Sequence, residues 1–207
     1  MPRFRTLITG CLAAILAGAL LASTGTGATT KSLPTTFVGD SVAASIAFTP
    51  RAQAVLSRGL RVRFDLRVCR RLVTVGCPYQ GSAPPNALQA VQSRGRSLGD
   101  VLVVYVGYNE SSAGYAKGID RIMRAALRQG ANGVVWVTLR EERDIYRQTN
   151  AVIRTAAKRW PQLQVADWHA YSDGKPWFSE DGLHMTPAGA ESLARFLRPY
   201  VFRAAVA

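Results

Sequence analysis

Val101-Leu102-Val103-Val104-Tyr105-Val106 is a stretch in which every side chain is aliphatic or aromatic, and residues 134–137 (Val-Val-Trp-Val) share this property. Side chains of a β-strand alternate between its two faces, so a strand that is apolar throughout must be covered on both faces. Sheets buried in this way are mostly parallel and lie between two layers of helices. These two stretches therefore predict the central strands of a three-layer α/β domain.

Shorter stretches with strand character lie on either side of this centre, and segments with helical periodicity separate them. The expected strands are residues 35–38, 60–66, 101–106, 134–139 and 163–166, and the expected helices are residues 42–58, 86–94, 114–129, 144–160 and 187–200. In the segment 114–129, Ile119, Ile122 and Leu127 fall on one helical face and most charged side chains fall elsewhere. The alternation predicts one αβα domain with a mainly parallel, five-stranded sheet.

The chain of 207 residues is basic, since 26 lysines and arginines oppose 13 acidic residues and give a formal net charge of +13. Hydrophobic residues make up 48% of the chain, which excludes a sequence too polar to fold. The charge favours anionic neighbours such as an acidic cell-wall polymer, although the densest group of arginines, in residues 58–71, is expected to form a solvated face. The sequence contains no metal-ligand cluster, phosphate-binding loop or nucleic-acid motif, so we expect no metal, no cofactor and no nucleic-acid partner.

The first thirty residues are typical of a targeting signal. Arg3 and Arg5 precede an apolar stretch over residues 7–22, which is shorter than the ~20 residues that a membrane-spanning helix needs. Small polar residues follow, and secretion or export to the cell envelope is therefore expected. The predicted division of the chain is a signal peptide at residues 1–28, a short segment at residues 29–36 and a folded domain at residues 37–207. Cleavage after Ala22, lipid attachment at Cys11 and an uncleaved anchor are the alternatives.

Export determines how the cysteines are interpreted. Removal of the signal peptide would leave Cys69 and Cys77 as a pair in an oxidising compartment. A disulfide between them would close a short loop and stabilise the fold by roughly 2–3 kcal/mol. We predict this disulfide, and two free buried thiols are the alternative.

Parallel sheets bind their ligands at the edge where the carboxyl ends of the strands lie. Two of the loops that we expect at this edge carry residues suited to ester cleavage. Gly39-Asp40-Ser41 ends the first strand, where a serine would expose its hydroxyl above the sheet and leave its own N–H free. Asp40 can fix this turn by a local hydrogen bond. Asn109 follows the third strand and can donate its side-chain amide to an oxyanion. Taken singly, helix capping and turn formation explain these residues as well.

The loop before the last helix contains a candidate acid–base pair. Thr186 as N-cap and Pro187 at the first helical position mark the start of that helix, so His184 lies immediately before it. Asp181 can accept a hydrogen bond from one imidazole nitrogen and leave the other to take a proton from a hydroxyl. Alone, this could be an incidental pair. Together, a nucleophile, an oxyanion donor and an acid–base pair occupy the first, third and last post-strand loops of one sheet.

At these positions the sequence resembles the SGNH (GDSL) superfamily of esterases and lipases. The matching blocks are Gly39-Asp40-Ser41-Val42, Gly107-Tyr108-Asn109 and Asp181-Gly182-Leu183-His184, in order along nearly the whole mature chain. The resemblance implies a flavodoxin-like αβα fold and the hydrolysis or transfer of carboxylic esters. It makes Ser41 the nucleophile, His184 the base and Asp181 the residue that orients the base. The Ser41 backbone N–H and the Asn109 side chain would stabilise the oxyanion.

The sequence departs from the family after the second strand. Members usually have a glycine there whose N–H also binds the oxyanion, whereas residues 67–71 read Arg-Val-Cys-Arg-Arg. The backbone N–H of Cys69 or of Arg70 is a candidate replacement, and the sequence does not decide between them. Tyr108 and Trp177 are candidates for substrate binding, although packing within the loops also explains such aromatic residues.

We therefore expect a secreted serine esterase that works through an acyl-enzyme in an open cleft. An O-acyltransferase or a deacetylase acting on cell-wall or other carbohydrate would use the same residues. A non-catalytic exported protein that binds anionic polymer through its arginines is the alternative of another class. The expected partner is an ester substrate, either an acylated carbohydrate or a lipid. His169 belongs to no motif and is expected to be a loop residue rather than a second base.

Overall fold

The computed structural model describes Met1 and residues 32–207. The rest of the predicted signal peptide, including Cys11, and the expected start of the mature chain near Thr29 lie outside the described residues. The first strand begins at Leu33, four residues before the expected domain boundary. Within the described part of the chain, no helix is both long and apolar enough to cross a bilayer.

Five parallel strands form the sheet, in the order β2-β1-β3-β4-β5. They are β1 (Leu33–Gly39), β2 (Leu60–Leu66), β3 (Val101–Tyr105), β4 (Gly133–Val137) and β5 (Leu163–Ala166). Strands β3 and β4 are buried at every position, as their uninterrupted apolar sequences predict. The strand order is that of flavodoxin-like doubly wound sheets. The predicted α/β fold with a parallel, five-stranded sheet is therefore confirmed.

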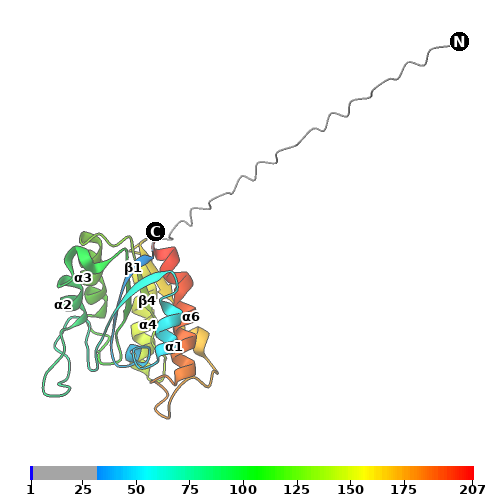
Figure 1. Cartoon of the computed structure of the whole chain (residues 1–207). Helices are drawn as coiled ribbons and strands as arrows, with labels where there is room; N and C mark the ends of the chain where they lie inside the picture. The colour runs from blue at the N-terminus through cyan, green and yellow to red at the C-terminus, as the bar shows by residue number, and fades with distance from the viewer. Residues whose placement is uncertain (2–31) are drawn as a thin grey trace. The chain divides into compact units, whose positions relative to one another are not determined.

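Helices cover both faces of this sheet, and Figure 1 shows the resulting three layers. The helices are α1 (Pro50–Leu56), α2 (Ala87–Gln92), α3 (Tyr115–Arg128), α4 (Asp144–Ala157), α5 (Trp168–Ser172) and α6 (Pro187–Ala204), with 3₁₀ turns η1 (Ala43–Ser45) and η2 (Gly95–Leu98). Helices α1 and α6 pack together on one face, and α2 and α3 pack on the other. Each layer has its own apolar core, because Val103 and Val135 point toward α1 and α6 whereas Val104 and Val134 point toward α2 and α3.

One expected helix is divided in two. Helical periodicity predicts a helix over residues 42–58, but the chain forms η1 and then α1. Pro50 is the first residue of α1, and the residue before a proline is disfavoured in the helical conformation. Thr49 accordingly has an extended backbone, with φ of −120° and ψ of 93°. The break leaves Phe48 on the surface between the two segments, with 80% of its area exposed.

A buried arginine anchors the loop that follows β2. The Arg70 side chain is only 1% exposed; it pairs with Asp65 at 2.7 Å, and its Nε donates to the Pro85 carbonyl at 3.0 Å. Arg94 donates to the second oxygen of Asp65 at 2.9 Å. Burial raises the pKa of Asp65, but the hydrogen bonds and charges of Arg70 and Arg94 outweigh it and leave the pKa below its usual value. The expectation of a solvated basic face is therefore wrong for Arg70, which is turned into the protein.

The same loop contains the cysteine pair. Cys69 and Cys77 are joined, with Cα atoms 5.2 Å apart, which is an ordinary separation for a disulfide. The loop ends at Asn86, whose side chain caps α2 by accepting from the Gln89 N–H at 2.9 Å. The bridge, the buried arginine and the helix cap thus hold a long irregular segment against the sheet.

Replacing Arg70 with methionine should destabilise the domain, because the carboxylate of Asp65 then loses its buried partner. Breaking a buried ion pair in this way costs about 3–5 kcal/mol, and we expect about 2–3 kcal/mol here because Arg94 still pairs with Asp65. Denaturant unfolding followed by circular dichroism measures the loss. Arg71→Met is the matched control, since Arg71 is exposed. Equal losses in the two variants would contradict the anchoring role of Arg70.

Candidate active site

The predicted loops meet at the carboxyl edge of the sheet. Ser41 follows β1, Asn109 follows β3, and Asp181 and His184 lie in the loop before α6. His184 Nε2 lies 3.2 Å from Ser41 Oγ, and His184 Nδ1 lies 2.5 Å from Asp181 Oδ2. The Ser41 hydroxyl therefore forms one hydrogen-bonded series with an imidazole and a carboxylate that lie about 140 residues further along the chain.

A sharp turn at the end of β1 presents Ser41. Gly39 is required in this turn, because a Cβ there would lie 2.3 Å from the Cβ of Ala43 and 2.8 Å from the Leu66 side chain. The backbone N–H of Ser41 has no acceptor among the residues that the structure describes. That N–H is consequently free to bind an oxygen of a ligand.

Asp40 joins the loops after β1 and β3. Its side chain is fully buried; Oδ1 accepts from the Val42 N–H at 3.1 Å, and Oδ2 accepts from the Gly107 and Tyr108 N–H groups at 3.0 and 3.2 Å. Burial raises the pKa of Asp40 to about 6, although these hydrogen bonds oppose the shift. The sequence pattern predicts only the local bond within the turn. The two bonds to the loop after β3 require that β1 and β3 be neighbours, which local patterns do not show.

Hydrogen bonds within the loop that carries His184 hold its conformation. Asp181 Oδ1 accepts from the N–H groups of Leu183 and His184, both at 2.9 Å, and Gly182 has a φ of +69° that favours glycine. The Ser179 N–H donates to the His184 carbonyl at 2.7 Å. Burial raises the pKa of Asp181, but the hydrogen bonds from His184 and the backbone outweigh it and lower the pKa to about 2. The carboxylate is therefore ionised at neutral pH and can orient a protonated imidazole.

The loop after β2 lies beside the end of β1 and contains the two candidate backbone donors. The Arg70 N–H donates to the Arg67 carbonyl at 3.3 Å, whereas the Cys69 N–H has no acceptor within the described residues. The Asn109 amide donates to the Arg70 carbonyl at 3.3 Å. One of the two amide hydrogens of Asn109 is thus left for a ligand.

A hollow of about 440 Å³ opens beside Ser41 and His184. Its other lining residues are Ser45, Phe48, Thr49, Val68, Tyr79, Met185 and Pro187. None of these is a lysine, arginine, aspartate or glutamate, although such residues make up 19% of the chain. Phe48 and Tyr79 are exposed and offer aromatic surface to a ligand. The sequence patterns miss both residues, because neither belongs to a motif or to a regular apolar face.

The hydroxyl groups of Ser45 and Thr49, which line this hollow, are engaged within the protein. Ser45 Oγ accepts from the Met185 N–H at 3.3 Å, and the Thr49 hydroxyl donates to the Ser45 carbonyl at 2.9 Å. The wall away from Ser41 and His184 is therefore mostly apolar in character.

The two aromatic candidates for substrate binding lie outside the lining of this hollow. Tyr108 Oη is 2.9 Å from Tyr105 Oη and accepts from the Arg140 N–H at 2.7 Å, and burial raises the pKa of the Tyr108 hydroxyl. Trp177 stacks on Trp168 with ring centres 5.7 Å apart. Both rings thus pack within the protein, beside the loops that carry Asn109 and His184.

His169 is engaged with a different carboxylate from His184. It lies in α5, where its Nε2 is 3.6 Å from a Glu141 oxygen and its Nδ1 accepts from the Glu141 N–H at 3.4 Å. It is not part of the hollow beside Ser41. Neither imidazole nitrogen of His169 is hydrogen-bonded to a hydroxyl group of the described residues, and the Thr138 and Ser172 hydroxyls contact only its backbone.

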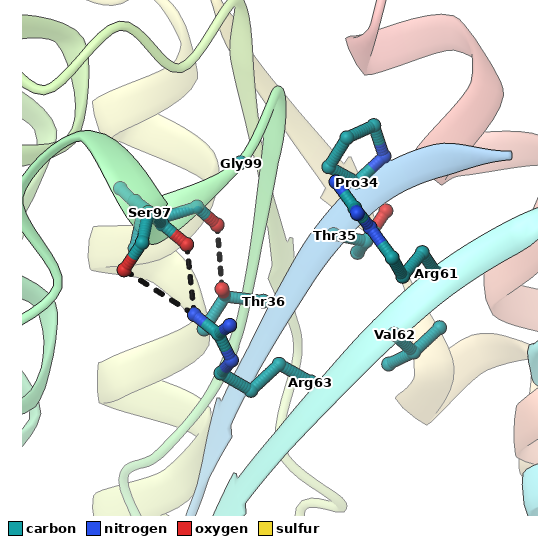
Figure 2. A pocket seen from close by; sticks show the side chains of 9 residues that line it. Pro34, Thr35, Thr36, Arg61, Val62, Arg63, Ser97 and Gly99 are labelled. Carbon is teal, nitrogen blue, oxygen red and sulfur yellow. Dashed lines mark hydrogen bonds between the residues drawn. The ribbon is translucent and has the colours of Figure 1, made fainter. Parts of the chain in front are cut away.

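A second hollow, of about 260 Å³, lies at the opposite edge of the sheet, where β1 and β2 begin (Figure 2). Two of its polar side chains are engaged: Arg63 donates to the carbonyl and hydroxyl oxygens of Ser97 at 2.9 and 3.3 Å, and Thr36 donates to the Leu98 carbonyl at 2.5 Å. None of the predicted catalytic residues lies there.

Across the described residues, no group of three histidine, cysteine or acidic side chains could hold a metal ion.

Solved structures that match this chain include several esterases. A carbohydrate acetylesterase family member from Sinorhizobium meliloti is 15% identical, and the match covers 84% of this chain and 99% of that one, with a TM-score of 0.64. A putative arylesterase from Agrobacterium tumefaciens is 13% identical over 83% of this chain and 99% of its own, with a TM-score of 0.65. The chain has the fold of these esterases.

The family 3 carbohydrate esterase of Clostridium thermocellum shares the esterase fold with a TM-score of 0.55, at 17% identity over 84% of this chain and 96% of its own. No protein-family model and no curated protein sequence matches the chain. The resemblance read from the sequence is therefore confirmed at the level of the fold, and the activity has to be argued from the site.

Replacing Asp40 with asparagine should destabilise the domain, because an NH₂ group would then face at least one backbone N–H in a fully buried place. A buried donor that lacks an acceptor costs about 1–3 kcal/mol. Thermal unfolding followed by circular dichroism measures the effect, with the exposed Asp173→Asn as control. If both variants unfold at the wild-type temperature, the two loops do not depend on this carboxylate.

Proposed function

We propose that this protein is a secreted serine esterase that acts on neutral carboxylic esters. The observation that carries the proposal is the series from Ser41 Oγ through His184 to Asp181, with separations of 3.2 and 2.5 Å, at the carboxyl edge of a sheet with the esterase fold. The solved esterases of this fold support the cleavage of ester bonds. The signal-like N-terminal sequence and the paired cysteines support export.

The geometry supports a two-step mechanism. Ser41 Oγ attacks the carbonyl carbon of the ester while His184 Nε2 takes the hydroxyl proton, and ionised Asp181 stabilises the resulting imidazolium. The alcohol leaves with the proton from His184, and the acyl group stays on Ser41. A water molecule, deprotonated by His184, then attacks the acyl-enzyme, releases the acid and restores the serine.

Preorganised donors are needed where negative charge develops on the carbonyl oxygen. The Ser41 N–H is without an acceptor in the described part of the chain, and Asn109 has an amide hydrogen to spare. Because Asp40 ties the loops that carry these two donors, their separation is established before substrate arrives. This arrangement lowers the barrier without reorganisation of the protein.

The hollow beside Ser41 supports a neutral substrate. It contains no charged side chain, and Phe48 and Tyr79 offer flat apolar surfaces that suit an acyl chain, an aryl group or the face of a sugar ring. The named activities of the solved esterases include carbohydrate deacetylation, which supports an acetylated carbohydrate as one such substrate. Transfer of the acyl group to a carbohydrate hydroxyl would use the same residues, and adding a carbohydrate acceptor to the assay distinguishes transfer from hydrolysis.

The described residues do not support a non-catalytic role in binding anionic polymer. Arg63, in the middle of β2, and Arg70 and Arg94, which both pair with Asp65, all donate to groups of the protein itself. No arginine or lysine lines the hollow beside the proposed nucleophile. Catalysis therefore accounts for more of the observed geometry than polymer binding does.

Replacing Ser41 or His184 with alanine should remove nearly all turnover of p-nitrophenyl acetate. Because the two residues act as one unit, each single change should cost about as much as the double change, on the order of 10⁴-fold or more in kcat. Asn109→Ala should cost about 10²–10³-fold, through loss of an oxyanion donor. Initial rates of the purified variants measure these losses, and circular dichroism verifies that they are folded.

His169→Ala is the matched control for the base, and it should stay within a few-fold of the wild-type rate. An inactive His169→Ala together with an active His184→Ala would show that His169, and not His184, transfers the proton. Full activity of Ser41→Ala would rule out the acyl-enzyme mechanism.

Replacing Phe48 with alanine should weaken substrate binding more than chemistry. We expect the substrate to lose about 1 kcal/mol of binding free energy, which is part of what burial of a whole phenylalanine side chain contributes. This loss should raise KM for p-nitrophenyl butyrate by about 5-fold. The kcat should change little, because this wall contacts the substrate equally in the ground and transition states. Phe202→Ala, at an exposed position of α6 outside the hollow, is the control. A KM unchanged by Phe48→Ala would exclude this wall from the substrate site.

A further inference from the structure

Cys69 occupies a turn position that ordinarily belongs to glycine. The Arg70 N–H donates to the Arg67 carbonyl at 3.3 Å, so Val68 and Cys69 form the centre of a β-turn. Cys69 has a φ of +64°, and Val68 has no positive φ, which is the arrangement of a type II turn. The third position of this turn strongly favours glycine, because L side chains rarely adopt that conformation.

A neighbouring segment holds the Cys69 backbone in place. The Cys69 side chain is joined to Cys77, and Gly76 packs so closely that a Cβ there would lie 2.1 Å from the Cys69 carbonyl oxygen. Both the side chain and the carbonyl group of Cys69 are therefore restrained by residues 76–77. The bridge thus supplies a constraint that lets a residue other than glycine occupy this position.

The restrained peptide lies at the catalytic edge. Val68 lines the hollow together with Ser41, and the Arg70 carbonyl, on the other side of Cys69, accepts from the Asn109 amide. The Cys69 N–H lies between these two neighbours in the chain, and no described residue accepts from it. A backbone donor without a partner next to a nucleophile is well suited to bind an oxyanion.

We propose that the Cys69–Cys77 disulfide positions the Cys69 N–H as a donor to the oxyanion that forms at Ser41. This inference rests on the proposed esterase function. It makes Cys69 and Cys77 positioning residues, whose sulfur atoms need not touch the substrate. Without the bridge, Cys69 would favour conformations with negative φ, and its N–H would turn away from the acyl oxygen.

Two double variants of the full protein test this role. Cys69→Ala with Cys77→Ala removes the bridge and leaves a residue that disfavours a φ of +64°, whereas Cys69→Gly with Cys77→Ala removes the same bridge and supplies a residue that adopts this φ freely. We expect kcat of the alanine variant to fall by about 10-fold or more, toward the 10²–10³-fold that loss of one oxyanion donor costs. The KM should change less, and the glycine variant should recover most of the lost kcat.

The rates are compared at a temperature at which circular dichroism shows both variants to be folded. Unfolding then does not contribute to the difference in kcat. Equal kcat values in the two variants, whether both high or both low, would overturn the inference. Wild-type protein without esterase activity would overturn both this inference and the proposed function, whereas an active wild type with equal variants would overturn this inference alone.

Reduction provides a second test if the alanine variant does not fold. Dithiothreitol converts the bridge to two thiols and is itself oxidised to its cyclic disulfide. The kcat of reduced, folded wild type should fall, whereas the glycine variant, which has no bridge, should not respond to the reductant. Loss of activity in both proteins, or in neither, would contradict a positioning role for the disulfide.

Discussion

One buried carboxylate, which accepts hydrogen bonds from three backbone N–H groups, determines the geometry of the loops at the carboxyl edge of the sheet. Asp40 accepts from its own turn and from Gly107 and Tyr108 after β3. A carboxylate without solvent contact is costly unless hydrogen bonds satisfy its oxygens, so neither loop can move away without a penalty. Ser41 is adjacent to Asp40, and Asn109 is adjacent to Tyr108. The separation of the proposed nucleophile and oxyanion donor therefore depends on this one side chain.

The polar groups of irregular loops at a sheet edge cannot all form strand or helix hydrogen bonds. In this protein, arginine side chains donate hydrogen bonds to several of them. Arg70 and Arg94 converge on Asp65 at the end of β2, where the Arg70 side chain is buried. Part of the excess of arginine thus serves the interior of the loops, because a partly buried carboxylate needs donors close by. This use of arginine explains how a strongly basic chain can have an uncharged hollow beside its proposed nucleophile.

Three of the solved esterases share the fold with this chain at identities of 13–17%, so chains that differ in most side chains form the same fold. A fold alone does not define an activity, and the proposed chemistry depends on a small set of atoms at the carboxyl edge. In the loop after β2, a backbone conformation that favours glycine occurs at another residue. Where glycine would adopt a positive φ without assistance, this chain has Cys69, and a covalent bridge to Cys77 accompanies the same backbone conformation.

The sequence by itself determined the parallel sheet and the candidate reacting groups, because these depend on local signals. Uninterrupted apolar residues predict β3 and β4, and the Thr186-Pro187 helix start places His184 just before α6. Only the tertiary structure decided what those groups meet: the bonds from Asp40 to the loop after β3, the burial of Arg70 and the exposed place of Phe48 beside Ser41. The physical reason is that these contacts depend on which strands are neighbours, and neither periodicity nor capping carries that long-range information.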